Sequence, residues 1–308
     1  MSDRRILVTG GAGFIGSNIA NALVADNEVR VVDDESLGTS AHLDDQVRFH
    51  QRSVLDDSLP MEGVDCLVHF AARSSYDLVE EEPAAGFRVN VEGFVNTVEQ
   101  AMEAGCDHVV YASSSSVYAP HEQPVGRDAP VEPNTGYEAS KLAREQAATY
   151  LASHYGLTVT GLRLFSVYEG LSAGESHKGG YANIISQFAA KLADGTSPVV
   201  FGDGTQTRDF IHVDDVVEAV SAVIDAECSG IYNVGTGTAT SFNEVIDWLN
   251  TELGTDIDPV YRAHPMPRSV YVEHTCADTS GLQAATGWEP TVDLQTGIAR
   301  VCRPYQTT

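Results

Sequence analysis

Tyr137 and Lys141 are the two residues whose types and spacing most directly suggest chemistry. They stand four positions apart in the run YEASK, and Lys141 is one of only three lysines among the 308 residues. On a helix, residues four apart lie on the same face. An ammonium group there stabilises a tyrosinate and lowers the phenol pKa from its usual value of about 10. The pair therefore predicts a tyrosine general base that works near neutral pH, although this spacing is also common on solvated helix faces.

A glycine-rich turn near the start of the chain predicts a dinucleotide site. Gly10, Gly13 and Gly16 follow a short apolar strand and open a helical pattern whose first residues include Phe14 and Ile15. Glycine allows a tight turn and lets the backbone approach a pyrophosphate closely. The helix N-terminus then offers free N–H groups and positive charge to the phosphates.

Asp33 supports the same interpretation. It ends the second predicted strand, about 20 residues beyond the glycine turn, where dinucleotide-binding proteins place an acid. A carboxylate at this point accepts hydrogen bonds from the adenine ribose hydroxyls and repels a 2′-phosphate. The sequence therefore favours NAD over NADP.

Strand and helix patterns alternate through the first half of the chain. Continuous apolar strands between helices indicate a parallel sheet with both faces covered. We therefore predict an α/β fold: a Rossmann-type doubly wound parallel sheet with a smaller α/β C-terminal substrate-binding lobe. The expected strands are 6–8, 28–33, 47–50, 64–69, 107–113 and 157–165, and the expected helices are 14–25, 84–105 and 137–155.

The alternation ends after Phe165. The following segment is rich in loops with one helical pattern at 181–194, and residues 209–213 are predicted to return to the sheet. We therefore expect two units. The first is an NAD-binding domain of residues 1–165, to which 209–240 return, and the second is a substrate lobe formed by 166–208 and 241–308.

The chain is strongly acidic. It carries 44 Asp and Glu against 18 Lys and Arg, which gives a formal net charge of −26, and the acids are scattered along the sequence. This charge repels nucleic acid and anionic membranes, so neither is expected as a partner. Many carboxylates with few lysines are typical of salt-adapted microbes. We therefore expect stability to rise with salt as carboxylate repulsion is screened.

The sequence indicates no membrane span, disulfide framework or metal site. No apolar run approaches the roughly 18 residues that a span needs, and the first residues pass into a strand-like segment without a signal-peptide pattern. A cytoplasmic location is therefore expected. The five cysteines lack a C-x-x-C pair and are predicted to be small buried side chains. The ten histidines show no metal-ligand spacing, so we expect no metal.

Taken together, the motifs resemble those of the extended short-chain dehydrogenase/reductase superfamily. Within it, the chain is most similar to nucleotide-sugar 4-epimerases of the UDP-galactose 4-epimerase type. The resemblance covers essentially the whole chain and includes the runs HFAA at 69–72, SSSSVY at 113–118 and TQTRDFI at 205–211. It implies NAD as the cofactor, a UDP-sugar as the substrate, and a homodimer in which the helices at 84–105 and 137–155 face the partner copy.

The resemblance also implies a role for each matching residue. Tyr137 is expected to be the catalytic base, Lys141 its partner that also binds the nicotinamide ribose, and Ser114 the group that bonds the sugar 4-hydroxyl. Cofactor contacts are expected from Gly10, Gly13, Phe14, Ile15, Gly16, Asp33, Ala71, Asn90, Tyr137 and Lys141. Nucleotide-sugar contacts are expected from Ser114, Ser115, Ser166, Asn183, Arg208 and Arg268, with the two arginines on the diphosphate.

Several positions depart from the family pattern. Ser166 stands where the family usually has Asn, Glu169 where it has Gly, and Ser53 where it often has Asp. The usual RPGD is RSVY from Arg268 onward. Thr275 falls where relatives that exclude N-acetyl groups carry a bulky aromatic, so its small size suggests room. Neither the sugar nor the nucleotide base follows from these residues.

The serine run selects the reaction. Related 4,6-dehydratases carry Asp and Glu directly after the active-site Ser or Thr, and related decarboxylases commonly carry Glu at the second of these positions. Here the two positions are Ser115 and Ser116, whose hydroxyls do not transfer protons near neutral pH. Epimerisation needs only one base, so we predict a 4-epimerase that oxidises C4 transiently and returns hydride to the opposite face.

Three alternatives remain open from the sequence. The first is an oxidoreductase that releases NADH, such as a keto-sugar reductase. The second is a dehydratase or decarboxylase that takes its acid from another loop. The third is a non-catalytic NAD-binding sensor, which the intact set of Tyr137, Lys141 and Ser114 disfavours.

Overall fold

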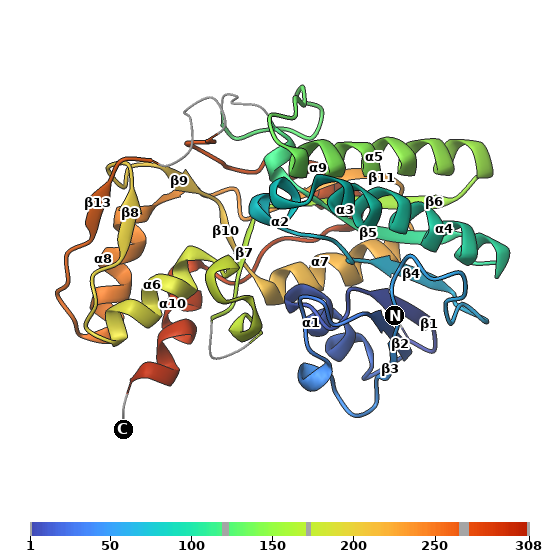
Figure 1. The fold of residues 1–308 in the computed structure, drawn as a ribbon, viewed down its shortest axis with the longest axis horizontal. Helices are drawn as coiled ribbons and strands as arrows, with labels where there is room; N and C mark the ends of the chain where they lie inside the picture. The colour runs from blue at the N-terminus through green and yellow to red at the C-terminus, as the bar shows by residue number, and fades with distance from the viewer. Residues whose placement is uncertain (1, 119–122, 171–173, 265–270, 307–308) are drawn as a thin grey trace.

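A seven-stranded parallel sheet forms the centre of the computed structural model, which describes residues 2–118, 123–170, 174–264 and 271–306 (Figure 1). The strand order is β11-β6-β5-β4-β1-β2-β3. The order reverses direction between β1 and β4, which is where doubly wound sheets bind ligands. The strands are β1 (Arg5–Thr9), β2 (Glu28–Asp33), β3 (Arg48–Gln51), β4 (Cys66–His69), β5 (His108–Ser114), β6 (Thr158–Leu164) and β11 (Gly230–Val234).

Helices cover both faces of this sheet (Figure 1). One face carries α1 (Phe14–Leu23) and α7 (Val213–Ala226), and the other carries α4 (Gly93–Glu103) and α5 (Gly136–Tyr155). Successive residues of β4 show why the strands read as continuous apolar runs. Leu67 belongs to the core under α4 and α5, whereas Val68 belongs to the core under α1 and α7. The predicted α/β fold with a Rossmann-type sheet is confirmed.

The predicted helix at 84–105 is built from three parts. It consists of α3 (Pro83–Phe87), a π-helical turn (Arg88–Glu92) and α4, and it is preceded by the short helix α2 (Tyr76–Glu81). A π turn rotates the helix face by one residue. Asn90 lies in this turn and is completely buried, so the irregular turn carries a polar side chain that the resemblance assigns to the cofactor site.

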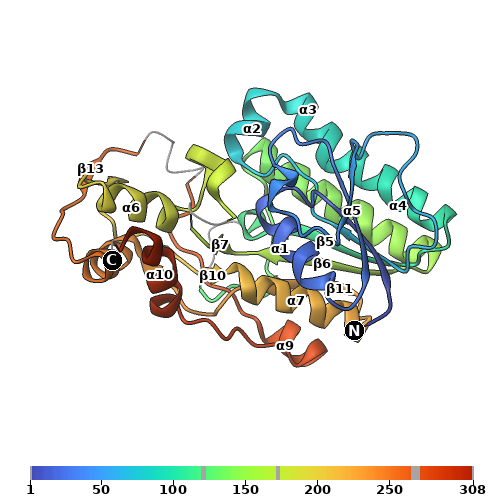
Figure 2. The same cartoon turned by 90° about the horizontal axis from the view of Figure 1, so that it is seen from below.

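A second, smaller core lies at the end of the molecule away from α4, where Figure 2 shows α6 and α10. Three two-stranded sheets surround it. The elements are β7 (Ser166–Tyr168), β8 (Val199–Phe201), β9 (Thr207–Arg208), β10 (Phe210–His212), β12 (Thr240–Ser241), β13 (Val260–Arg262), α6 (Ile184–Ala193), α8 (Phe242–Leu253) and α10 (Leu294–Cys302).

The structure corrects one predicted strand. Residues 210–212 form β10, but β10 pairs in parallel with β7 and is not part of the seven-stranded sheet. The chain returns to the central sheet through α7 and β11 instead. In addition, α9 (Ser280–Thr286) contacts α7 and β11, and its Leu282 belongs to the core of the central sheet. The division into an NAD-binding domain and a substrate lobe stays a prediction.

Four of the cysteines are buried, as predicted, whereas Cys228 is partly exposed; all five are free. Across the described residues, the structure contains no helix with the length and apolarity needed to cross a bilayer. The same part of the chain contains no cluster of three or more His, Cys, Asp or Glu side chains that could hold a metal ion.

Candidate active site

The glycine turn brings the backbone of β1 against that of β4. Gly10 adopts φ of +70°, and a Cβ there would lie 2.5 Å from the backbone nitrogen of Ala71. A Cβ on Gly16 would collide with the carbonyl oxygen of Gly10. Gly13 occupies the N-cap of α1 and offers no side chain to cap it. The turn is therefore tight, lacks side-chain bulk and leaves the positive end of α1 open to an anion.

Asp33 lies beside this turn at the carboxyl end of β2. One carboxylate oxygen accepts a hydrogen bond from the Ala12 N–H at 3.1 Å, and the other accepts one from the Glu35 N–H at 2.8 Å. Burial raises the pKa of Asp33 above its usual value, and these two N–H donors oppose the rise. The carboxylate is thus held in place by backbone donors and faces a cavity.

A cavity of about 590 Å³ joins the turn to the predicted catalytic residues. From the predicted set, its lining contains Gly10, Gly13, Phe14, Ile15, Gly16, Asp33, Ala71, Ser114, Tyr137 and Lys141. These residues come from the carboxyl ends of β1, β2, β4 and β5 and from the start of α5. The structure therefore brings together residues separated by up to 131 positions (10 to 141) at the switch point of the sheet.

Helix α5 presents Tyr137 and Lys141 to this cavity. Thr135 caps the helix by accepting a hydrogen bond from the Glu138 N–H, so Tyr137 lies in the first turn. The Lys141 Nζ lies 5.6 Å from the centre of the Tyr137 ring. Lys141 is buried, whereas Tyr137 is partly exposed. The predicted one-turn spacing does place the amine beside the phenol.

The electrostatics of this pair differ from the sequence-based expectation. Burial raises the pKa of Tyr137, while a hydrogen bond from Ser114 and the charge of Arg144 lower it. Burial, and then the charge of Arg144, also holds the pKa of Lys141 well below its usual value. The phenol pKa is therefore raised, contrary to the expected lowering by Lys141, because burial of the phenol outweighs the Ser114 hydrogen bond and the charge of Arg144.

The first two residues of the serine run, Ser113 and Ser114, line the cavity, and the Ser114 side chain hydrogen-bonds to Tyr137. Ser114 ends β5, and Ser115 and Ser116 form a short 3₁₀ turn directly after it. The hydroxyls of Ser114 and Ser116 lie 2.9 Å apart, and the Ser116 N–H donates to the Ser114 hydroxyl at 3.2 Å. Ser114 is thus oriented toward Tyr137 by its own turn. Ser115 does not line the cavity.

Asn90 lies behind the cavity wall. Its amide oxygen accepts from the Arg73 N–H at 2.8 Å, and its amide nitrogen donates to the Ser140 hydroxyl at 2.9 Å and to the Arg73 carbonyl at 3.2 Å. Asn90 therefore joins the loop after β4 to helix α5. It supports the cofactor side of the cavity without lining it.

Two predicted substrate residues use their polar groups within the protein. The Asn183 amide caps α6, where its oxygen accepts from the Ile185 N–H at 3.1 Å and its nitrogen donates to the Val167 carbonyl at 3.0 Å. Ser166 lies in β7, and its N–H donates to the Asp209 carbonyl at 3.0 Å. Neither side chain lines the cavity.

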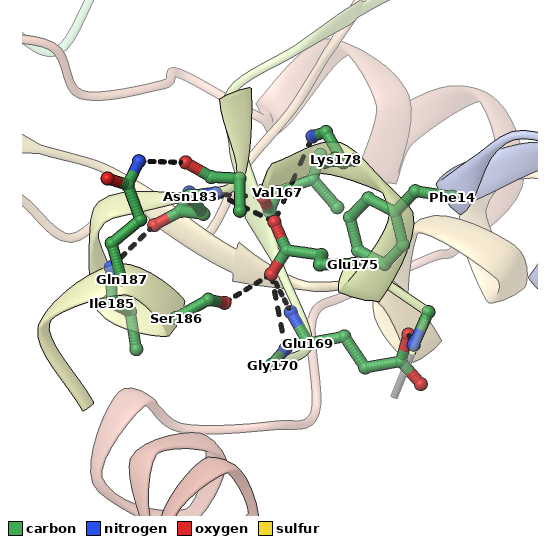
Figure 3. A network of polar contacts seen from close by, with 12 residues as sticks. Phe14, Val167, Glu169, Gly170, Glu175, Lys178, Asn183, Ile185, Ser186 and Gln187 are labelled. Carbon is green, nitrogen blue, oxygen red and sulfur yellow. Dashed lines mark hydrogen bonds and ion pairs between the residues drawn. The ribbon is translucent and has the colours of Figure 1, made fainter. Parts of the chain in front are cut away.

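Figure 3 shows that Asn183 belongs to a network around Glu175, whose side chain is completely buried. The Glu175 carboxylate accepts hydrogen bonds from the N–H groups of Glu169 and Gly170 at 3.1 Å each, from the Asn183 N–H at 2.7 Å, and from the Ser186 hydroxyl. This network fixes the loop between β7 and α6. As a result, Lys178 lies with its Nζ 5.1 Å from the centre of the Phe14 ring, at the cavity edge.

The predicted diphosphate-binding arginines fall outside the cavity or outside the described residues. Arg208 lies in β9 and donates to the carbonyls of Thr207 at 2.8 Å and Glu273 at 3.1 Å. Its guanidinium also lies 5.2 Å from the ring centre of Tyr271. Arg268 lies outside the described residues. The Thr275 hydroxyl accepts a hydrogen bond from the Asp209 N–H at 3.4 Å.

The residues that depart from the family pattern have definite contacts. Glu169 accepts from the Asn18 side chain at 3.2 Å and from the Gly174 N–H at 2.9 Å, so it ties the loop after β7 to helix α1. Ser53 accepts a hydrogen bond from the Leu55 N–H at 3.3 Å. Both side chains therefore stabilise the loops that carry them.

The sequence did not single out several residues of the site. Arg73, His177 and Lys178 line the cavity, and Arg144 and Glu175 support it from behind. One signal was available, because Lys178 is the second of three lysines in an acidic chain. The others carry no local pattern, since their roles follow only from tertiary contacts.

Residues 6–235 match the NAD dependent epimerase/dehydratase family. Among curated proteins, the chain is 34% identical over 304 residues to a putative UDP-glucose 4-epimerase of Methanocaldococcus jannaschii, with 96% of each chain covered. It is also 34% identical over 311 residues to a UDP-glucose 4-epimerase of Mycolicibacterium smegmatis, again with 96% of each covered. A dTDP-glucose 4,6-dehydratase of Streptomyces griseus is 30% identical over 317 residues, covering 97% of this chain and 93% of that protein.

The chain also superimposes closely on solved structures. A UDP-N-acetylglucosamine 4-epimerase of Methanobrevibacter ruminantium in complex with UDP-N-acetylmuramic acid superimposes with a TM-score of 0.90 at 27% identity, covering 98% of both chains. A UDP-glucose 4-epimerase of Thermotoga maritima with UDP-glucose gives 0.89 at 29% identity and 97% coverage of both. The Thermus thermophilus UDP-glucose 4-epimerase complex with NAD gives 0.84 at 30% identity and 98% coverage of both.

Proposed function

Because the chain belongs to the NAD dependent epimerase/dehydratase family, we propose that it is an NAD-dependent 4-epimerase of a nucleotide sugar, of the UDP-glucose/UDP-galactose type. The observation that carries this proposal is that Tyr137, Lys141 and Ser114 line the same cavity as the glycine turn and Asp33. A proton acceptor, its amine partner and a hydroxyl thus converge on one dinucleotide site.

The residues present fit NAD. The turn that would collide with any Cβ at Gly10 or Gly16 leaves room for a pyrophosphate against the α1 N-terminus. The Asp33 carboxylate at the end of β2 suits the adenine ribose. When bound, NAD supplies the hydride acceptor and donor for C4 of the sugar.

Tyr137 and Ser114 supply the proton chemistry. Tyr137 takes the proton of the sugar 4-hydroxyl while C4 is oxidised, and it returns that proton when C4 is reduced from the other face. Ser114 hydrogen-bonds to both the phenol and the 4-hydroxyl, so it fixes the path of the proton. Between the two half-reactions the 4-keto sugar turns within the pocket while its nucleotide remains anchored.

The serine turn favours epimerisation over elimination. Ser115 and Ser116 form the turn after Ser114, and neither hydroxyl is an acid or base near neutral pH. The curated relatives include a dTDP-glucose 4,6-dehydratase, so a dehydratase remains the second candidate. For that reaction, the acid would have to come from a loop outside the serine turn.

Two measurements on the purified protein test the proposal. Mass spectrometry of the protein as purified is expected to find bound NAD. Incubation with UDP-glucose, UDP-N-acetylglucosamine and UDP-glucuronate without added coenzyme is then expected to convert at least one of them to its 4-epimer. Loss of water, loss of CO₂ or stoichiometric NADH release would instead assign a dehydratase, a decarboxylase or a reductase.

On the substrate side, we propose that Arg208 and Arg268 bind the diphosphate and that Ser115, Ser166 and Asn183 contact the nucleotide sugar. Arg208 has the strongest support, because burial lowers the pKa of its guanidinium, which contacts the carbonyls of Thr207 and Glu273 and the Tyr271 side chain. An anionic ligand would stabilise such a cation.

We also propose that α3, α4 and α5 form a homodimer interface. Aromatic side chains are exposed on this side, with Tyr150 at 56% and Tyr155 at 49% on α5 and Phe87 at 38% on α3. Light scattering is expected to give twice the monomer mass of 33.0 kDa. Replacing Tyr150 and Tyr155 with Ser is expected to weaken the association, and an unchanged mass would contradict this interface.

Finally, we propose a salt-adapted protein of the cytoplasm. The support is the net charge of −26 on 308 residues, which destabilises a compact chain by self-repulsion until salt screens it. The melting temperature is expected to rise between low and molar KCl. A melting temperature that fell over this range would remove the proposal.

A further inference from the structure

Arg144 is a completely buried cation whose hydrogen bonds go to neutral carbonyl groups. Its Nε donates to the Asn90 carbonyl at 2.7 Å, and its two terminal nitrogens donate to the carbonyls of Ala112 at 3.1 Å and Ala71 at 2.9 Å. Its guanidinium also lies 5.7 Å from the ring centre of Phe94. Across the described parts of the chain, no carboxylate lies within ion-pair distance of Arg144.

Its location is directly behind the reactive wall of the cavity. Ala71 and Ala112, whose carbonyls it binds, both line that cavity. Arg144 also follows Tyr137 by seven residues and Lys141 by three on helix α5, so all three residues share one helix face. The guanidinium therefore joins the carboxyl ends of β4 and β5 at the point where the phenol and the amine enter the cavity.

The neighbouring carboxylate on α5 is committed to another cation. Glu145 accepts from Arg163 of β6 at 2.9 and 2.7 Å and from the Ser113 hydroxyl at 2.6 Å. Glu145 and Arg163 thus compensate each other, and the charge of Arg144 remains uncompensated. A charge left unpaired in a low-dielectric interior acts on nearby ionisable groups more strongly than it would in water.

Several titratable groups lie around this charge. On α5 these are Tyr137, Glu138, Lys141 and Glu145; His69 comes from β4, Tyr111 from β5 and Arg163 from β6, while Glu80 of α2 reaches Gly136 at the start of α5. Glu138 raises the pKa of Tyr137, and Arg144 lowers it. Burial lowers the pKa of Arg144 to about 10, so the guanidinium stays charged at neutral pH.

We propose that Arg144 is a positioning residue for the reaction: its buried guanidinium holds the ends of β4 and β5 together and provides the fixed positive charge behind the Tyr137 hydroxyl. The proposal rests on the proposed function, since it assigns Tyr137 as the base. Under this proposal, Arg144 provides a permanent positive charge on α5, and Lys141 provides an amine that forms hydrogen bonds.

The first test is the pH profile of kcat for Arg144→Gln, Arg144→Lys and Phe94→Leu. Phe94→Leu is the matched control, because it disturbs the packing under the guanidinium and keeps the charge. In Arg144→Gln the rising limb is expected to move to higher pH by about one pH unit, with about tenfold lower kcat at pH 7 that recovers in alkali. Arg144→Lys is expected to recover most of this loss, and Phe94→Leu to keep the wild-type midpoint.

The second test does not require turnover. The absorbance of tyrosinate, taken as the difference between the as-purified protein and Tyr137→Phe, reports the ionisation midpoint of Tyr137 itself. This midpoint is expected to move upward in Arg144→Gln and to stay within half a pH unit of wild type in Lys141→Met.

The two measurements test the proposed function and the role of Arg144 separately. Absence of epimerase activity would contradict the proposed function. The ionisation midpoint of Tyr137, measured by absorbance, would still test the role of Arg144. If Arg144→Gln does not fold, Lys141→Met still decides, because a shift of a full pH unit in that variant would overturn the proposal. An unchanged midpoint in a folded Arg144→Gln would also overturn it.

Discussion

The region of the glycine turn and the region of the smaller core differ in how their predicted residues are used. Around the glycine turn, the predicted residues Gly10, Asp33, Ser114 and Tyr137 line one cavity. Around the smaller core, Asn183 caps its own helix with its side chain, and Arg208 donates to the carbonyls of Thr207 and Glu273. The first set of residues therefore shares a cavity, whereas the side chains of Asn183 and Arg208 bond to groups within the protein.

This difference follows from the source of each residue's position. The turn between β1 and α1 fixes part of its own geometry, because a Cβ at Gly16 would collide with the Gly10 carbonyl of the same turn. The position of Asn183 depends on a loop held by buried Glu175 (Figure 3). The position of a residue in a motif that fixes its own geometry can be predicted from the sequence. The position of a residue that depends on contacts with other segments cannot.

The largest expected effect is on kcat, from the loss of the proton acceptor in the cavity. Tyr137→Phe removes the proton acceptor and is expected to lower kcat by about 10³-fold or more, while bound NAD is retained. The comparison variant is Ser114→Ala, for which a smaller loss is expected because the phenol remains. Epimerisation at a near wild-type rate in Tyr137→Phe would contradict the assigned base.

The next effect tests the tightness of the turn. A Cβ at position 16 would overlap the Gly10 carbonyl oxygen, whereas a Cβ at Gly13 would lie 3.3 Å from the same atom. Gly16→Ala is therefore expected to cost about 2–3 kcal/mol of unfolding free energy and to lose NAD during purification. Gly13→Ala is expected to cost less. Thermal unfolding of the two variants checks this order, and equal losses would show that the overlap is relieved elsewhere.

A smaller effect is expected from Arg208, in the region of the smaller core. Arg208→Gln is expected to raise KM for the nucleotide sugar about tenfold, because a charge-assisted hydrogen bond to the diphosphate is lost. NAD content should stay unchanged. Arg262→Gln on β13 is the control, since that side chain is exposed. If KM is unaffected in Arg208→Gln, this arginine serves the packing of its lobe only.

The smallest effect concerns Asp33 and pH. Burial raises the pKa of this carboxyl, so it takes up a proton at a higher pH than an ordinary aspartate would. NAD affinity is therefore expected to fall severalfold on mild acidification, because the protonated group accepts hydrogen bonds poorly. Asp33→Asn is expected to weaken NAD severalfold at pH 7 and to remove this pH dependence. Fluorescence titration with NAD at several pH values measures this dependence. An NAD affinity that does not change with pH would contradict the prediction.

Much of the fold could be predicted because apolar runs mark buried strands such as β1, β4 and β5, and a shorter apolar pattern marks β2. The predicted β2 at 28–33 agrees with the structure at both ends. The prediction that 209–213 returns to the central sheet is wrong, because a short apolar segment does not specify its partner and β10 pairs with β7 instead. Asp209 belongs to a recognised motif, yet its buried carboxylate accepts hydrogen bonds from Thr236, Gly237 and Ala277. A motif therefore indicated where a residue lies more reliably than what its side chain binds.

The buried charges escaped prediction for a related reason. Arg144 and Glu175 are polar residues in positions that the sequence assigns to an ordinary helix and a loop. The Arg144 guanidinium donates to carbonyls of segments far along the chain, whereas the Glu175 carboxylate accepts from N–H groups of its own loop and of the N-cap of α6. Local periodicity carries no information about such partners.

Transfer of isotope from C4 tests the central claim most directly. Purified protein without added coenzyme is incubated with UDP-glucose that carries deuterium at C4 of the sugar. The predicted result is UDP-galactose that still carries deuterium at C4, because hydride leaves this carbon and returns to its opposite face within one turnover. An epimer whose label has been exchanged with water would contradict transient oxidation at C4.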